Sequence, residues 1–127
     1  MLTLTELLIS AVVMLLLDAI YLSTFKDFFN TIVQNVQGSR IKFKLIGAVL
    51  CYILLIGGLH YFIIGRHKSW REAFILGVVI YGVYETTTYA LFDKWSPWAI
   101  LLDTLWGGIL FALTTAITYT LLAKVHF

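Results

Sequence analysis

Four long, predominantly apolar segments follow one another along the chain, at about residues 4–23, 43–64, 73–92 and 99–122. Each is long enough to cross a bilayer, because roughly 20 residues of helix span ~30 Å of hydrocarbon. The segments are continuous and do not alternate polar with apolar residues, which favours helices over the strands of a membrane barrel. The pattern predicts an all-α integral membrane protein in which residues 1–127 form a single domain of four transmembrane helices.

The connection between the first two spans has a different pattern. Between residues 25 and 37 the apolar side chains recur at the spacing of one face of a helix, and polar side chains fill the other face. Gly38 and Ser39 then interrupt this pattern. We expect an amphipathic connecting helix that lies in the membrane interface or along the bundle. Its apolar residues are Phe25, Phe28, Phe29, Ile32, Val33 and Val36.

The other two connections are shorter. Residues 65–72 predict a polar loop, and residues 93–98 predict a tight turn with Trp95 and Trp98 at the level of the lipid headgroups.

Composition supports a lipid environment. Of the 127 residues, 61% are hydrophobic and 13% are charged, whereas charged residues make up about a quarter of an ordinary soluble domain. The net charge of +2 gives no indication of a nucleic-acid partner. We therefore expect a multi-pass protein of the lipid bilayer, with no cofactor.

Four spans place both termini on one side of the membrane, together with the second connection. The positive charges are nearly balanced between the two sides, so the positive-inside rule does not fix the orientation. The cluster Arg40, Lys42 and Lys44 weakly favours a cytoplasmic location for the first and third connections. Balanced charge also permits an antiparallel homodimer.

Three carboxylates lie at membrane depth, well inside the predicted spans: Asp18, Glu85 and Asp103. Counted along their helices at 1.5 Å per residue, all three lie roughly 6–11 Å from the same membrane boundary. Ionisable groups at this depth are costly and are functional candidates. No lysine or arginine lies at that depth, so we expect either a hydrated or paired cluster or protonation of at least one acid.

Hydroxyl-bearing and small residues share helical faces with these acids. Asp18 shares a face with Tyr21, Met14 and Ala11; Glu85 with Tyr81, Thr88 and Tyr89; and Asp103 with Gly107, Leu110 and Thr114. One interpretation is a proton, cation or polar-ligand site. The other is a scaffold in which the acids bond to hydroxyls, to backbone or to Trp106 and fix the helices in register.

Two further groups of residues are candidates for packing or relay. His60 follows Gly57 and Gly58 near the opposite boundary, where it is either a core histidine or part of a proton relay from that side. Gly108, Ala112 and Ala116 recur every fourth residue beside Gly107, a pattern of small residues that lets helices approach closely within the bundle or in a homodimer.

No catalytic motif accompanies these residues. The sequence contains no HExxH, no GxSxG and no glycine-rich phosphate loop, and a lone His60 beside three separate acids is a poor metal-ligand set. We therefore predict neither an enzyme nor a metal site.

Three segments give the chain a resemblance to a known family. Residues 17–22 (LDAIYL), 81–87 (YGVYETT) and 102–108 (LDTLWGG) resemble the family catalogued as domain of unknown function 2177, whose members are short four-helix predicted membrane proteins. Glu85 stands where the family pattern has aspartate, and Thr88 where asparagine is usual. The form of residues 103–108 looks more like the family's large-DNA-virus or algal members. The resemblance implies the fold and the same three acids, and no activity.

Three functions remain open at this point. The first is binding or conduction of protons, cations or a small cationic solute at Asp18, Glu85 and Asp103, in a homodimer if solute is transported. The second is a non-catalytic accessory or assembly role in which the acids are structural. The third is lipid binding through the amphipathic segment.

Overall fold

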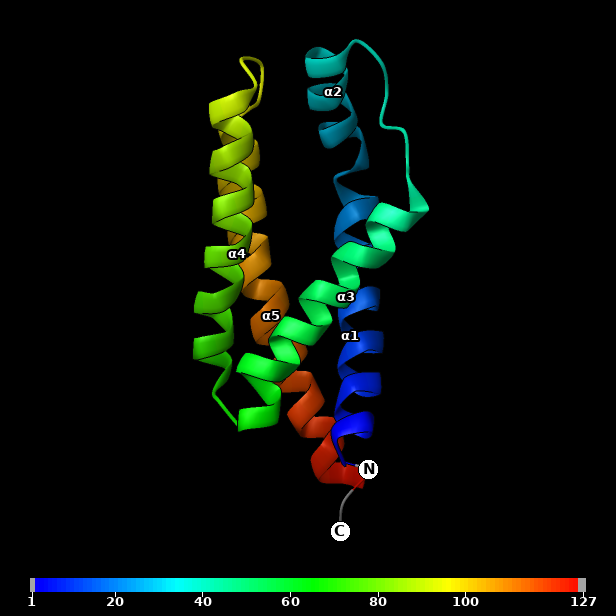
Figure 1. The fold of residues 1–127 in the computed structure, drawn as a ribbon, viewed down its shortest axis with the longest axis vertical. Coiled ribbons are helices and arrows are strands. Elements are labelled where there is room, and N and C mark those ends of the chain that lie inside the picture. Colours follow the sequence, from blue (N-terminus) through cyan, green and yellow to red (C-terminus); the bar gives the residue numbers. More distant parts are fainter. Residues whose placement is uncertain (1, 126–127) are drawn as a thin grey trace.

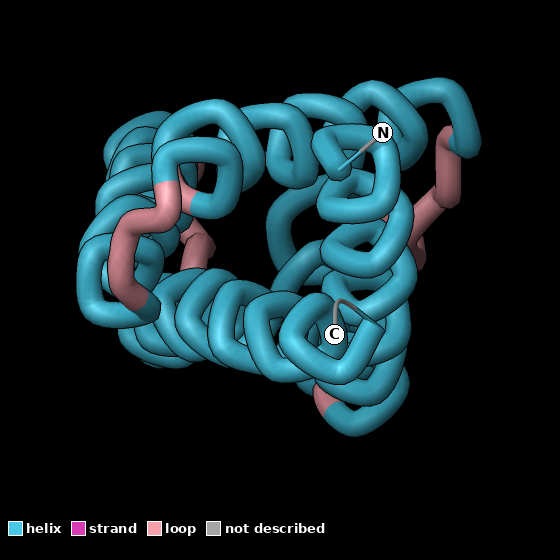
Figure 2. Tube along the Cα trace, turned by 90° about the horizontal axis from the view of Figure 1, so that it is seen from below, coloured by secondary structure: helices cyan, strands magenta, loops and turns pink. Residues whose placement is uncertain are grey.

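The computed structural model describes residues 2–125, and over this range it contains only helices and short connections. These residues form five α-helices and one short 3-10 helix. Figure 1 shows how the α-helices are arranged, and Figure 2 shows how little of the chain lies in loops. The helices are α1 (Leu2–Thr24), α2 (Lys26–Gln37), α3 (Leu45–Phe62), η1 (Ile64–Arg66), α4 (Trp70–Leu91) and α5 (Pro97–Val125).

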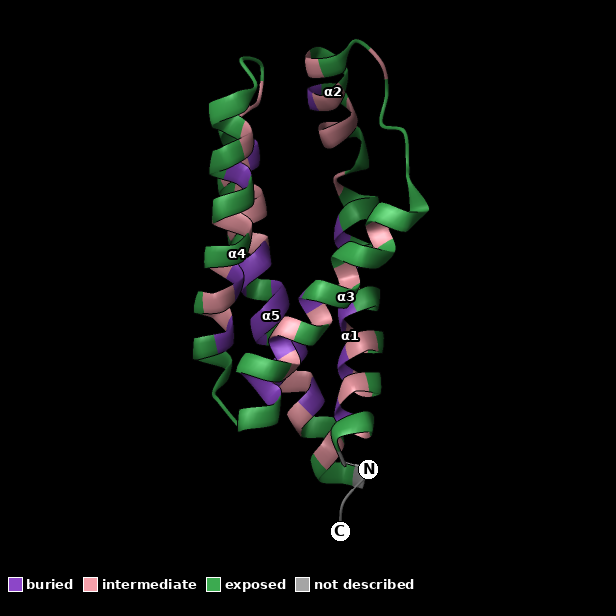
Figure 3. Cartoon of the chain, in the orientation of Figure 1, coloured by how far each residue is buried: buried purple, intermediate pink, exposed green. Residues whose placement is uncertain are grey.

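Four of these helical segments are long and apolar enough to cross a membrane, in agreement with the four predicted spans. They are Thr3–Thr24, Leu45–Arg66, Trp70–Leu91 and Pro97–Lys124. Their outer surfaces are apolar and exposed, as Figure 3 shows, with Leu54 75% and Leu91 72% exposed. Such a surface is suited to lipid and not to water.

The bundle has two distinct ends. α2 and the turn between α4 and α5 lie at one end, here called the α2 end. The start of α1 and the end of α5 lie together at the other, here called the terminal end. α1 and α5 run antiparallel and pack together, and α3 crosses them obliquely.

The α4–α5 hairpin is the most closely packed part of the fold, and glycines make it possible. A Cβ atom at Gly77 would collide with the backbone carbonyl of Gly107, and one at Gly107 would collide with the ring of Tyr81. Gly108 approaches Phe74 and Val78 in the same way. Ala112 is buried one turn further on, so the small-residue face of α5 is turned toward α4.

An apolar cluster fills the middle of the bundle. Met14 of α1, Leu59 of α3 and Leu110 and Phe111 of α5 are all fully buried there. Complete burial of such side chains contributes roughly 1.5–3 kcal/mol each relative to exposure in water, although lipid weakens this term between helices. We call this cluster the central plug.

α1 and α2 meet at a bend, where Thr24 and Phe25 lie. The Thr24 hydroxyl donates to the Ile20 carbonyl at 2.7 Å, a back-bond that bends helices. α2 ends at Gly38, which adopts a positive φ of 78° and donates its N–H to the Gln34 carbonyl. The chain then returns in extended form to α3, and the Asn30 side chain accepts from the Ile41 N–H at 3.2 Å.

Several span boundaries differ from those predicted. The second span begins at Leu45 and not at residue 43, because the chain stays extended through Lys44 as it descends from α2. The third begins at Trp70, three residues before the predicted start, because Ser69 and Glu72 form a capping box. The fourth begins at Pro97, whose missing N–H costs nothing in the first turn of a helix. The polar loop and the tight turn are shorter than predicted for the same reasons.

Gly77→Ala tests the glycine contact between α4 and α5. We expect it to destabilise the protein by about 1–3 kcal/mol, because the added methyl group must displace the Gly107 backbone. Reversible unfolding in mixed micelles would measure the change. Gly57→Ala is the matched control, because a Cβ there meets no atom within 4 Å. Equal stability of the two variants would contradict the packing described.

Candidate functional site

Asp18 holds together three helices in a nearly dry setting. The carboxylate is 6% exposed, and Trp106 of α5 donates its indole N–H to Oδ1 at 2.9 Å. The Tyr52 hydroxyl of α3 donates to Oδ2. Both carboxylate oxygens therefore have a partner, and this acid fits the scaffold interpretation.

Asp103 lies one step nearer the α2 end of the bundle. It accepts a hydrogen bond from the Tyr21 hydroxyl at 2.8 Å. The Tyr21 ring stacks on the Trp106 indole, with centroids 4.7 Å apart and planes within 2° of parallel. The two aromatic residues thus connect the Asp18 and Asp103 carboxylates through one rigid stack.

Glu85 is the most deeply buried of the three predicted acids, at 0% exposure. Trp95, in the turn between α4 and α5, donates its indole N–H to Glu85 Oε1 at 2.9 Å. No donor reaches Glu85 Oε2 among the described residues. The Asp103 carboxyl lies within hydrogen-bonding range of Glu85, so a proton shared by the two acids would satisfy this oxygen. A buried carboxylate oxygen without a donor is unusual and calls for a ligand, a proton or water.

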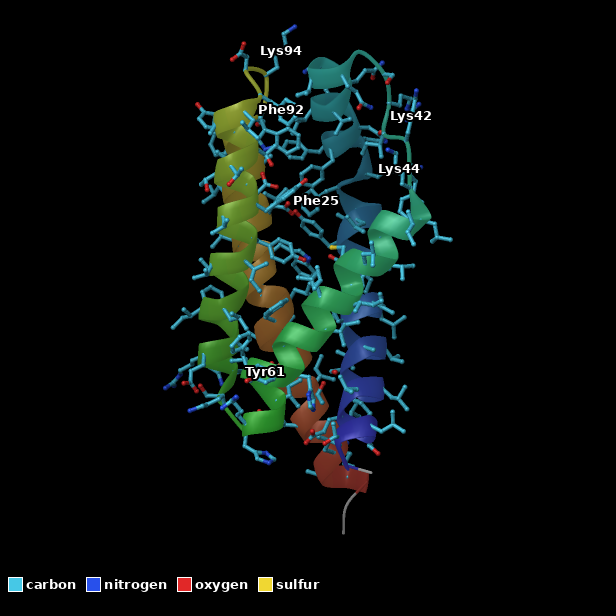
Figure 4. All side chains as sticks on the ribbon, viewed as in Figure 1. Phe25, Lys42, Lys44, Tyr61, Phe92 and Lys94 are labelled. Carbon is cyan, nitrogen blue, oxygen red and sulfur yellow. The ribbon has the colours of Figure 1, made fainter. Side chains whose placement is uncertain are left out.

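Glu85 and Asp103 line a cavity of about 670 Å³ at the α2 end of the bundle. α2 and the segment after it form one wall, and α4, α5 and Trp95 form the other. Figure 4 shows side chains, among them that of Phe25, filling the neighbouring space between the α1–α2 bend and the α4–α5 hairpin. Asp18 does not line the cavity, so the three acids divide into a cavity pair and a scaffold acid.

The cavity combines opposite charges with an apolar wall. Lys26 and Arg40 line it from the α2 side, and no salt bridge joins either of them to the acids among the described residues. Lys42 and Lys44 do not line it and lie along the extended segment at the other edge of the molecule (Figure 4). The remaining lining residues are Leu22, Ser23, Phe29, Asn30, Val33, Ile41, Phe43, Tyr84 and Trp95.

The residues predicted to support the acids make different contacts in the structure. Tyr21 and Trp106 bond to acids, as described. Tyr81 packs edge-on against Phe111 and covers Gly107. The Thr88 hydroxyl bonds to the Tyr84 carbonyl of its own helix at 2.7 Å, and Tyr89 is 49% exposed. Thr114 is fully buried, far along α5 from Asp103 and beyond the central plug.

His60 has a partner that residue spacing alone does not reveal. Its Nε2 lies 2.9 Å from Oε1 of Glu6, a fourth buried acid at 4% exposure. A Cβ atom at Gly57 or Gly58 would meet no atom within 4 Å, so neither glycine brings α3 against another of the described helices. Gly65 is the close neighbour of His60, because a Cβ there would touch the imidazole at 3.0 Å.

Three partner residues escape reasoning from the sequence: Glu6, Tyr52 and Trp95. Glu6 is visible as an acid inside an apolar run, but a position near the start of a span is one where an acid is ordinarily exposed. Tyr52 lies within an apolar span and Trp95 lies in a turn at headgroup level, where aromatic residues are common, so neither position indicates a bond to an acid. Their hydrogen bonds depend on how helices cross, which residue spacing within one helix does not specify.

No group of three or more histidine, cysteine or acidic residues within the described part of the chain is close enough to hold a metal ion. The fold and the acids thus define a small helical membrane protein with four candidate spans. Its carboxylates inside the bundle lie toward both ends: Asp18, Glu85 and Asp103 toward the α2 end, and Glu6 toward the terminal end.

The model of the family described as predicted membrane protein (DUF2177) matches residues 3–120. The chain belongs to this family, as its three segments indicated. No curated protein and no solved structure matches the chain.

Trp106→Phe tests the scaffold role of Asp18. The substitution keeps an aromatic ring but leaves Oδ1 without its donor, so we expect a loss of about 1–3 kcal/mol of stability. Unfolding of the double variant with Asp18→Asn should show a coupling between the two sites. Trp98→Phe, at a side chain 71% exposed, is the control and should cost little. Additive effects at positions 18 and 106 would contradict the bond.

Proposed function

We propose that the Glu85–Asp103 cavity binds a proton, a small cation or the cationic group of a small solute from the α2 end. The observation that carries this proposal is the Glu85 carboxylate, which is fully buried against the cavity, receives no donor at Oε2 among the described residues, and has the Asp103 carboxyl within hydrogen-bonding range. An anionic oxygen in a low-dielectric setting attracts a cation or a proton far more strongly than the same oxygen in water.

Asp103 increases the attraction of the site for a cation or a proton, because it adds a second negative charge beside Glu85. Two neighbouring carboxylates repel each other unless a cation or a proton lies between them. Tyr21 and Trp95 each donate to one oxygen of their carboxylate, which restrains the two acidic side chains. Such preorganisation lowers the cost of binding.

The central plug favours a binding site over an open pore. Met14, Leu59, Leu110 and Phe111 are completely buried between the cavity and the terminal end. An ion in transit needs polar groups to replace its hydration, and these side chains provide none. A solute that crosses the bundle therefore requires a conformational change or a second copy of the chain, the homodimer expected from the sequence.

α2 completes the site at the membrane surface. We propose that it lies in the interface as an amphipathic helix. Ile32 is buried and Phe28, Phe29 and Val33 are half-buried, whereas Lys26 and Asp27 are exposed. This distribution suits a helix whose apolar side covers the cavity and whose charges remain among the headgroups.

The Trp95 indole N–H provides a direct reporter of the cavity. In ¹⁵N-labelled protein in nanodiscs, we expect its NMR resonance to move on titration with sodium, potassium or tetramethylammonium, or with pH, because its acceptor Glu85 changes charge environment. Glu85→Gln and Asp103→Asn should each abolish the response. Asp93→Asn, an exposed acid outside the cavity lining, should retain it.

A Trp95 resonance that ignores all three cations and pH would contradict the proposal. Liposomes then test conduction separately: flux of protons or cations above protein-free background, lost in Glu85→Gln, extends binding to transport. Binding without flux limits the role to capture.

The second candidate function is the binding of a zwitterionic phospholipid headgroup. The cavity places Lys26 and Arg40 opposite Glu85 and Asp103, and its other lining is largely apolar. A phosphate bound by the two cations and an ammonium bound by the two acids would satisfy both charge pairs. This arrangement is the specific observation that favours a lipid over a free cation.

Native mass spectrometry distinguishes the two candidates. A lipid-binding protein should retain phosphatidylethanolamine or phosphatidylcholine through detergent purification, and Arg40→Gln should release it. Lys42→Gln, which alters a cation outside the cavity lining, should not. A protein that is free of lipid but responsive to small cations would exclude the lipid candidate.

A further inference from the structure

The polar contacts between α1 and α5 fix how the two helices align. Tyr21 meets Asp103, and three residues earlier on α1 Asp18 meets Trp106, three residues later on α5. Because the helices are antiparallel, each further step back along α1 is matched by an equal step forward along α5. Met14 therefore lies level with Leu110, in agreement with their shared place in the central plug.

The same register continues beyond the plug to the terminal end. It places Ser10 level with Thr114 and Glu6 level with Thr118. All four side chains are buried: Glu6 at 4%, Ser10 at 1%, and both threonines at 0%. The interface of α1 with α5 is thus polar on both sides of an apolar centre.

The threonines at this end are unusual because their hydroxyls have no partner. A threonine within a helix commonly donates to a carbonyl of its own preceding turn, as Thr120 does to Ala116 at 2.9 Å. Thr114 and Thr118 make no such bond among the described residues. A buried hydroxyl without a partner costs about 1–3 kcal/mol, and a bridging water molecule is the ordinary remedy.

His60 brings a titratable ring to this group. Its Nε2 lies 2.9 Å from Glu6 Oε1, and its side chain is 16% exposed. From α5, Tyr119 also faces the pair, but its hydroxyl is held by the Lys68 carbonyl at 2.7 Å. The Arg66 guanidinium of η1 lies over the Tyr61 ring and bonds to the Tyr61 carbonyl, so it is directed away from the pair.

We propose that Glu6, His60, Thr114 and Thr118 form a second polar site that binds a proton and water from the terminal end. The imidazole and the carboxylate hold the proton, and the two threonine hydroxyls hold water beside them. This site uses other residues than the Glu85–Asp103 cavity and lies on the other side of the central plug. The chain then has a proton-binding group near each membrane surface, which proton-coupled exchange across the plug requires.

Histidine NMR of the full chain in nanodiscs tests the proposal. The chemical shifts of the His60 ring nitrogens, recorded over a pH range from about 4 to 9, report which protonation state the ring holds. Thr118→Val removes a hydroxyl at nearly constant volume and should change the curve of His60 ring shift against pH, because that hydroxyl holds water beside the pair. Thr120→Val is the matched control and should leave the curve in place, because its hydroxyl is exposed and bonded within its own helix.

A His60 ring that keeps one protonation state over this pH range overturns the proposal. So does an identical curve in wild type and Thr118→Val, because a dry structural threonine would have no influence on His60. Water-edited NMR provides an independent measurement that needs no substitution. Magnetisation transfer from water to Thr114 and Thr118 supports the site, and transfer no greater than to Leu110 in the plug overturns it.

Discussion

The fold depends on the hydrogen bonds that Asp18 accepts from two other helices. In lipid, a carboxylate without donors is very costly, and no water is at hand to replace them. Trp106 and Tyr52 satisfy both oxygens and so fix α5 and α3 against α1. The register set by this contact places Tyr21 at Asp103, aligns the central plug, and brings the threonines of α5 level with Glu6. The bonds to Asp18 are thus in register with the other polar side chains of the interface between α1 and α5.

This alignment explains why Asp18 is a structural acid whereas Glu85 and Asp103 line a cavity. Asp18 has no free oxygen and little access, so its charge is used for structure. Glu85 and Asp103 lie nearer the α2 end, where α1 bends away into α2 and leaves a cavity against the α4–α5 hairpin. The close glycine contact between α4 and α5 makes that hairpin a rigid wall. A closely packed wall bearing acids, opposite α2 bearing Lys26, is the arrangement from which the proposed binding role follows.

Much of this architecture could be predicted from the sequence, because hydrophobic length and helical periodicity are properties of single segments. The four spans, the end of α2 at Gly38 and the three acids are visible in that way. Partnerships between segments are not. Tyr52 reaches Asp18 because α3 crosses obliquely, and Trp95 turns inward because the α4–α5 turn is short. Which of the three acids lines the cavity could not be predicted for the same reason: equal depth does not specify which way each carboxylate faces.

The most direct test compares the access of water to the two indole N–H groups that hold acids. Hydrogen–deuterium exchange in nanodiscs resolves the Trp95 and Trp106 indole resonances in one spectrum. We predict fast exchange at Trp95, which lines the cavity beside Glu85, and exchange at least tenfold slower at Trp106, which is bonded to Asp18 in a dry interface. Equal rates, or faster exchange at Trp106, would contradict the separation of a hydrated site from a structural acid.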